Sequence, residues 1–169
     1  SMISSSWAST HSGTTPNIAE VGLITRNVKI RSTSTTLMTY VYCTALSALT
    51  AQWAEFYYLG VSGTANKRGI EIDAGATATA KSITFCSIHD CDSNGLFASA
   101  SSNTSLNLTF SNNIIWNIYT NDAVEIAAAI TNNDWTIDSN LIVRVGTGNG
   151  IRLLDVGGTC TNNIVAGLL

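Results

Sequence analysis

The twenty residues Gly150–Leu169 read "GIRLLDVGGTCTNNIVAGLL" and hold three short apolar segments separated by glycine, threonine and asparagine. The same order of segments occurs three more times upstream. The first segments are GIEID at 69, GLFAS at 95, AVEIA at 123 and GIRLL at 150, so they recur after 26, 28 and 27 residues. A regular period of this size is typical of a repeat architecture.

Two further series share this period. The second segments are SITFCS at 82, LNLTFSNN at 106, DWTIDSN at 134 and TCTNN at 159. The third segments are IHDC at 88, IIWNI at 114, LIVRV at 141 and IVAGLL at 164. Upstream, NVKIRS at 27 and WAEFYYLG at 53 fit the second series. Each repeat therefore comprises three short strands in about 27 residues.

Apolar and polar residues alternate within the segments, as in strands with one buried face. Ile70 and Ile72, for example, flank Glu71. Three short strands cannot bury such a face alone, but stacked repeats can. The sequence therefore predicts an all-β, single-stranded, right-handed parallel β-helix of five to six rungs over residues 19–169. Residues 1–18 are expected to be the tail of a preceding domain or an added segment, and the β-helix is expected to continue past residue 169 in the natural protein.

An antiparallel sandwich is the competing fold, because Asn-Gly pairs at 94–95 and 149–150 are hairpin signals. Both pairs fall at the same point of the repeat, which favours a rung corner. Three asparagines, Asn113, Asn140 and Asn163, precede the third segment in successive repeats. Asparagine tolerates the left-handed backbone of a sharp corner, and stacked amides form ladders. We expect a structural ladder that begins one rung after Ser87.

Composition excludes several function classes. Only 11% of residues are charged, the net charge is −3, and the eight basic residues form no run. This argues against a nucleic-acid partner and a polybasic membrane patch, and no apolar stretch is long enough for membrane insertion. The cysteines at 43, 86, 91 and 160 are too irregular for a disulfide framework, so we expect buried thiols. No cofactor is implied.

Outward-facing carboxylates are the candidates for catalysis. Glu71, Asp73 and Glu125 lie on first-series strands, and glycoside hydrolysis needs two carboxylates about 5 to 9.5 Å apart. Glu71 and Glu125 align two rungs apart, roughly 9.6 Å at the usual strand spacing, with Ala98 near the position between them. We take these three residues, with His89 in support, as the catalytic set of an enzyme.

The segment CSIHDC at 86–91 suggests zinc ligands, with Cys86, His89, Asp90 and Cys91 as the candidate set. Strand alternation places Cys86 and His89 on opposite sides, so no metal site is predicted.

Among the aromatic residues, Trp116 and Trp135 are predicted to face inward. Tyr57 or Tyr58 must face outward if Phe56 faces inward. Tyr57 and Tyr58 are therefore the predicted glycan-binding platform.

Three stretches, AEVGLITRNVKIRS at 19–32, WAEFYYLG at 53–60 and CSIHDC at 86–91, resemble in order and spacing the G8-domain proteins with parallel β-helix repeats. That family includes cell-surface and secreted hyaluronidases, fibrocystin-like proteins and microbial relatives. The resemblance implies a right-handed β-helix that follows a G8 domain. Animal hyaluronidases carry a His-rich strand where this chain has RGIEID at 68–73, so the resemblance implies the fold and not hyaluronan cleavage.

The sequence thus favours a non-catalytic segment of a large extracellular, cell-surface or virion-surface protein, which acts as a rigid spacer and contacts a glycan. Its expected partners are a polysaccharide, neighbouring domains of the parent chain, and a second copy by end-to-end association. The alternative is a hydrolase or lyase that degrades an acidic glycan.

Overall fold

The computed structural model describes residues 28–36, 38–99, 105–127, 134–154 and 157–167. They form sixteen strands. The strands are β1 (Lys29–Arg31), β2 (Val41–Cys43), β3 (Leu49–Gln52), β4 (Glu55–Tyr57), β5 (Ile70–Asp73), β6 (Lys81–Thr84), β7 (Ser87–Cys91), β8 (Leu96–Ser99), β9 (Leu108–Ser111), β10 (Ile114–Ile118), β11 (Val124–Ile126), β12 (Trp135–Asp138), β13 (Leu141–Val145), β14 (Ile151–Leu153), β15 (Thr159–Thr161) and β16 (Ile164–Ala166). This part of the chain contains no helix, and so none that could span a membrane.

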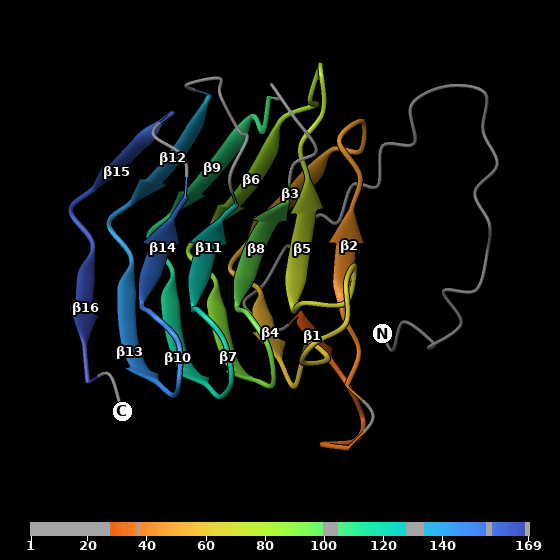
Figure 1. Cartoon of the computed structure of the whole chain (residues 1–169), viewed down its shortest axis with the longest axis vertical. Helices are drawn as coiled ribbons and strands as arrows, with labels where there is room; N and C mark the ends of the chain where they lie inside the picture. Colours follow the sequence, from red (N-terminus) through yellow and green to blue (C-terminus); the bar gives the residue numbers. More distant parts are fainter. Residues whose placement is uncertain (1–27, 37, 100–104, 128–133, 155–156, 168–169) are drawn as a thin grey trace, which may run out of the picture.

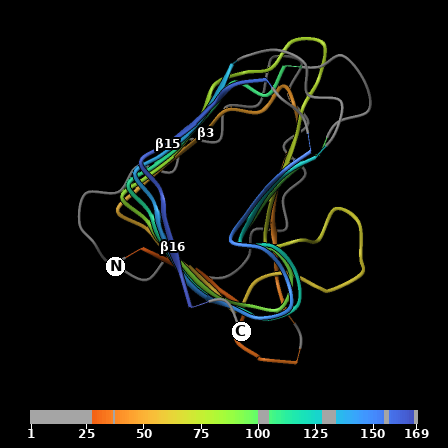
Figure 2. The same cartoon turned by 60° about the vertical axis from the view of Figure 1, so that its left-hand side comes forward.

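Every strand pairs in parallel with its counterpart one turn away (Figure 1). One sheet has the order β1-β4-β7-β10-β13-β16, a second β14-β11-β8-β5-β2, and a third β15-β12-β9-β6-β3. In Figure 2 the successive turns superpose along much of their length, which shows how closely each repeats the previous one. The predicted parallel β-helix, with about five turns of about 27 residues, is confirmed.

The first two upstream segments belong to a different series from the one predicted. Ile30 pairs with Phe56, and Phe56 pairs with Ile88, so NVKIRS and WAEFYYLG supply third-series strands rather than second-series strands. The loop closed by the hydrogen bond from the Val61 amide to the Lys67 carbonyl lengthens this turn. Phe56 and its partner Ile88 are therefore 32 residues apart, so the two upstream segments are out of phase with the later third-series strands.

The core consists of the inward side chains of all three sheets. Ile72, Ile83, Ile88 and their counterparts in the next two turns are fully buried, whereas those of the last described turn are exposed. Burying one such side chain contributes about 1.5–3 kcal/mol, and stacking places equivalent residues in contact along the axis. The stack is therefore continuous from one turn to the next.

Two corners are made by single residues with left-handed backbone. The corner before the six-stranded sheet has φ between 54° and 60° in five successive turns. The residues are Trp53, Phe85, Asn112, Ser139 and Asn162. The corner near the end of the same sheet has φ between 51° and 64°, at Tyr58, Asp90, Asn117, Arg144 and Gly167. These bends turn the chain, and after Tyr58, Asp90, Asn117 and Arg144 the next side chain is buried in the core.

The three predicted ladder asparagines follow the first of these corners. Asn113 Nδ2 donates to Asn140 Oδ1 at 3.0 Å, and Asn140 Nδ2 donates to Asn163 Oδ1 at 2.9 Å. Each amide also donates to a strand carbonyl of the preceding turn. The left-handed residue is the one before each ladder asparagine, and Cys86 rather than Ser87 precedes the ladder, since its amide donates to Asn113 Oδ1.

Replacing Asn140 with alanine should destabilise the fold by about 3 kcal/mol, because it removes a buried acceptor and two donors at once. The Asn113 amide and side chain would lose their partner, Asn140 Oδ1. Asn112→Gly is the matched control. That side chain is exposed and its φ of 56° suits glycine, so its effect should be about 0.5 kcal/mol or less. Urea unfolding of both variants gives the comparison, and equal losses would contradict the ladder's role.

Candidate functional site

Glu71 and Asp73 do not form an open acidic site. Glu71 is 2% exposed and accepts a hydrogen bond from the Arg68 amide at 3.1 Å. Asp73 accepts hydrogen bonds from the Tyr42 hydroxyl and, at 2.5 Å, from the Ser99 hydroxyl. Both carboxylates are thus engaged in structural contacts that strand alternation alone did not predict.

Glu71 and Glu125 do share a column two turns apart. The residue between them is Phe97, which pairs with both, and not Ala98. Phe97 is 5% exposed and lies under the Arg68 guanidinium, 4.2 Å from the ring centroid. An aromatic side chain therefore separates the two carboxylates, so they do not face a common substrate position.

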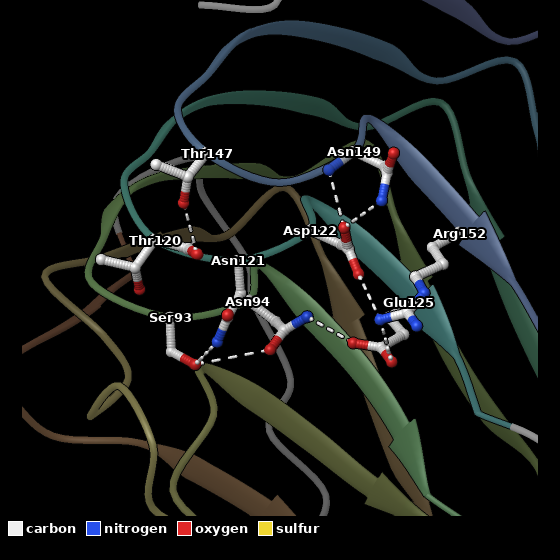
Figure 3. Close-up of polar contacts among 9 residues, drawn as sticks. All are labelled: Ser93, Asn94, Thr120, Asn121, Asp122, Glu125, Thr147, Asn149 and Arg152. Atoms are coloured by element: carbon white, nitrogen blue, oxygen red, sulfur yellow. Dashed lines mark hydrogen bonds and ion pairs between the residues drawn. The ribbon is translucent and has the colours of Figure 1, made fainter.

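Glu125 instead lies near the carboxyl group of Asp122 (Figure 3). Glu125 Oε2 accepts a hydrogen bond from Asn94 Nδ2 at 3.1 Å, and Arg152 lies 3.5 Å from Glu125 Oε1. The same guanidinium lies 3.6 Å from Asp122 Oδ2. Three successive turns thus contribute an amide, two carboxyl groups and a guanidinium to one site.

Asp122 was absent from the sequence-based candidates. It is 4% exposed, and its Oδ1 accepts hydrogen bonds from the Asn149 amide at 2.6 Å and from Asn149 Nδ2 at 2.8 Å. The signal was present in the repeat, because Asn94, Asp122 and Asn149 each precede a first-series strand by the same interval. Asn-Gly at two of these places predicts a rung corner, and that interpretation by itself does not point to a polar site.

These groups form the floor of a cleft of about 550 Å³. Arg68 lines it as well, and hydroxyl and amide groups of Thr120, Asn121 and Thr147 complete its wall. Thr147 Oγ1 donates to the Thr120 carbonyl at 2.7 Å, which holds the two corner loops together. The loops approach closely at Gly148, where a Cβ would lie 2.2 Å from the Asn121 carbonyl carbon.

The cleft perturbs the protonation of Glu125. Burial raises the pKa of Glu125 above that of an ordinary glutamate. The hydrogen bond from Asn94 and the charge of Arg152 lower this pKa, whereas the Asp122 carboxyl raises it, and the raising effects prevail.

The predicted supporting residue His89 lies elsewhere, on the outer face of the six-stranded sheet. Its ring stacks between Tyr57, with centroids 5.1 Å apart, and Trp116, with centroids 4.0 Å apart. Nε2 is 3.1 Å from Glu55 Oε1 and Nδ1 is 2.7 Å from Asp90 Oδ2. His89 therefore joins neighbouring turns and does not contact Glu71, Asp73 or Glu125 in any of these interactions.

The carboxylates around His89 are held in the charged form. The hydrogen bond from Lys29 is the main cause that lowers the pKa of Glu55. Burial acts to raise the pKa of Asp90, but hydrogen bonds from His89, Tyr119 and Asn117 outweigh it and the pKa lies below its ordinary value. Burial raises the pKa of Tyr119 to about 12, and the hydrogen bond from Tyr119 to Asp90 adds to this increase.

The predicted aromatic residues divide between core and surface. Trp135 faces inward and is 2% exposed, as predicted. Trp116 faces outward, against prediction, because Ile115 takes the inward position beside it. Tyr57 and Tyr58 are both half-buried, with centroids 5.1 Å apart, and Tyr57 is covered by His89 on one side.

Cys86 points into the core while His89 points outward, as alternation predicted, and the left-handed backbone at Asp90 turns Cys91 inward as well. Cys43, Cys86 and Cys91 are buried free thiols, whereas Cys160 is exposed. Among the described residues, no three histidine, cysteine or acidic side chains are placed to hold a metal ion. No protein-family model matches the chain, and neither a curated protein nor a solved structure is similar enough to count as a match.

The chemistry open to the cleft follows from its geometry. Asp122 Oδ2 lies 3.6 Å and Glu125 Oε1 lies 3.5 Å from Arg152 Nη1, so one guanidinium holds both carboxyl groups in the cleft. The same groups, with the amides and Arg152, offer donors and acceptors side by side. This arrangement suits a ligand that has many hydroxyl groups.

Glu125 should titrate above 4.5 and Glu55 below 4.5 in the folded protein, as followed by carboxyl carbon shifts in nuclear magnetic resonance. Asp122→Asn should lower the pKa of Glu125, because it removes a negative charge and keeps an acceptor for Asn149. A raised pKa means that the protonated form favours folding, so this contribution to stability is lost as pH rises through the raised value. A Glu125 that titrates at or below Glu55 would contradict the assigned environment.

Proposed function

We propose that this chain is a rigid, non-catalytic β-helix segment of a large extracellular, cell-surface or virion-surface protein, and that the cleft of Asp122, Glu125 and Arg152 binds a glycan. The observation that carries the proposal is the convergence of polar side chains from three turns on one open cleft. Sugar hydroxyls both donate and accept hydrogen bonds, so they match a site that alternates carboxyl, amide and guanidinium groups.

Stiffness supports the spacer role. Strands pair with the same strand of the next turn throughout the described stack, and the asparagine ladder adds side-chain hydrogen bonds along the axis. A binding cleft built on such a stack is preorganised, which lowers the entropic cost of holding a flexible sugar. The location of the parent protein outside the cell or on a virion rests on the family resemblance alone.

Isothermal titration calorimetry against hyaluronan, polygalacturonate and cellulose oligosaccharides tests the binding proposal. We expect at least one of these to bind, and Arg152→Ala to weaken that binding at least tenfold, about 1.4 kcal/mol. Arg31→Ala is the matched control, because it removes the same charge from an exposed residue that does not line the cleft. Equal losses in both variants would indicate a non-specific charge effect, and no binding by any of the three glycans would contradict the proposal.

Glycan cleavage is the second candidate function, and the raised pKa of Glu125 is the observation that favours it. A carboxyl group with a raised pKa in a cleft is suited to general acid catalysis. Hyaluronan and polygalacturonate incubated with the protein should keep their size on chromatography if the spacer proposal holds. A loss of size that disappears in Glu125→Gln but persists in Glu71→Gln would replace that proposal with an enzyme.

A further inference from the structure

A second cavity opens on the opposite corner of the six-stranded sheet. It is a groove of about 470 Å³, and its large apolar lining residues are Trp53, Phe85 and Ile114. Glu55, Ser87 and Asn112 add polar groups to it. The groove thus combines an apolar wall with hydrogen-bonding groups, a mixture that suits a ligand with both apolar and hydroxyl-bearing faces.

The aromatic wall is placed at a conformational cost. Trp53 and Phe85 have φ of 60° and 55°, a left-handed backbone that costs roughly 1–2 kcal/mol for a residue with a bulky side chain. Two of the later turns have asparagine at this corner, Asn112 and Asn162, and asparagine accepts the conformation more readily than an aromatic residue. The two rings stack with centroids 4.5 Å apart, yet Trp53 is 39% and Phe85 41% exposed. Large apolar groups kept exposed at strained positions are typical of a contact surface.

Strand β10 connects this groove to the polar cleft. Ile114, at its start, lines the groove and is 48% exposed. Trp116 faces outward midway along the strand, and the 47% exposed Tyr119 and then Thr120, which lines the cleft, follow its end. A hydrogen bond from the Tyr119 hydroxyl to Asp90 Oδ1 at 2.8 Å fixes that ring. One outward row of side chains therefore runs from the groove to the cleft.

We propose that a linear saccharide chain lies along this outward row of β10, with one end in the Trp53–Phe85 groove and the other beside Asp122 and Glu125. The inference rests on the proposed function and extends it from a single cleft to a track. The path from Ile114 to Thr120 has six residue steps of about 3.3 Å each and is shortened by the bend at Asn117. Its length corresponds to roughly four sugar units. A monosaccharide or disaccharide fills only one end, whereas a longer chain contacts both.

The track predicts that affinity depends on chain length. Occupying a second subsite through a continuous ligand raises affinity without any change in the first. A hexasaccharide should therefore bind at least tenfold more tightly than the disaccharide of the same series, and further lengthening should add little. Replacing Trp53 should reduce hexasaccharide binding to near the disaccharide level and leave disaccharide binding unchanged.

The test uses hyaluronan oligosaccharides and cello-oligosaccharides of two, four, six and eight units, titrated by calorimetry into the whole chain. Trp53→Asn is the test variant, because asparagine occupies the same corner in two later turns and should preserve the fold. Tyr40→Asn is the control, since Tyr40 is 41% exposed and does not line the groove or the cleft. Circular dichroism melts confirm that both variants are folded.

Three outcomes separate the claims. A length-dependent gain that Trp53→Asn removes and Tyr40→Asn preserves supports the track. Binding that is independent of length, or a gain that survives in Trp53→Asn, overturns the track and leaves the cleft as the glycan site. If neither the hyaluronan oligosaccharides nor the cello-oligosaccharides bind, and the polymers do not bind either, both the track and the proposed function are wrong.

Discussion

The hydrogen bonds between each strand and its copy one turn away are the constraint on which this structure depends. They fix the register of all three sheets, so that residues about 27 positions apart become neighbours along the axis. Each residue then belongs to a column, which is the set of equivalent residues in successive turns. The residues of one column must be able to pack against one another along the axis. Apolar columns form the core, left-handed columns form two of the corners, and the asparagine column supplies a ladder of amides.

The cleft is a consequence of the same constraint. Because the corner before the first-series strands repeats in register, Asn94, Asp122 and Asn149 occupy one column and meet the column of Glu125 and Arg152 beside it. Neither column alone holds a site. Their meeting point brings opposite charges and amides within hydrogen-bonding distance while the corner loops leave the site open to solvent. The glycan proposal depends on this combination of a rigid frame with exposed polar groups.

Much of the fold could be predicted because its strand segments recur along the sequence with a fixed period. The three strand series, the inward alternation and the positions of Asn113, Asn140 and Asn163 all follow from spacing. The first turns were placed in the wrong series because the Val61–Lys67 loop breaks the period. The left-handed corner residue was misplaced by one position, since asparagine pairs such as Asn112–Asn113 contain two residues that suit a bend and only one adopts it.

The site was harder to predict, because it depends on contacts between columns. Alternation correctly placed Glu71 and Glu125 in one column, but not the Phe97 ring between them or the Arg68 amide that engages Glu71. The sequence did not identify Asp122 as a site residue, because a polar residue at a rung corner predicts a turn and not a binding site. Sequence period determines which residues align along the axis, whereas side-chain reach across a corner determines which of them meet.

The most direct test of the account is a titration of the ¹⁵N-labelled protein with hyaluronan hexasaccharide and with cellohexaose, followed by backbone and asparagine side-chain amide shifts. We expect the largest changes at Thr120–Asp122, at Gly148 and Asn149, and at the Asn94 side chain. Changes confined to other corners of the β-helix, or no change with either sugar, would contradict the assignment of this cleft as a glycan-binding site.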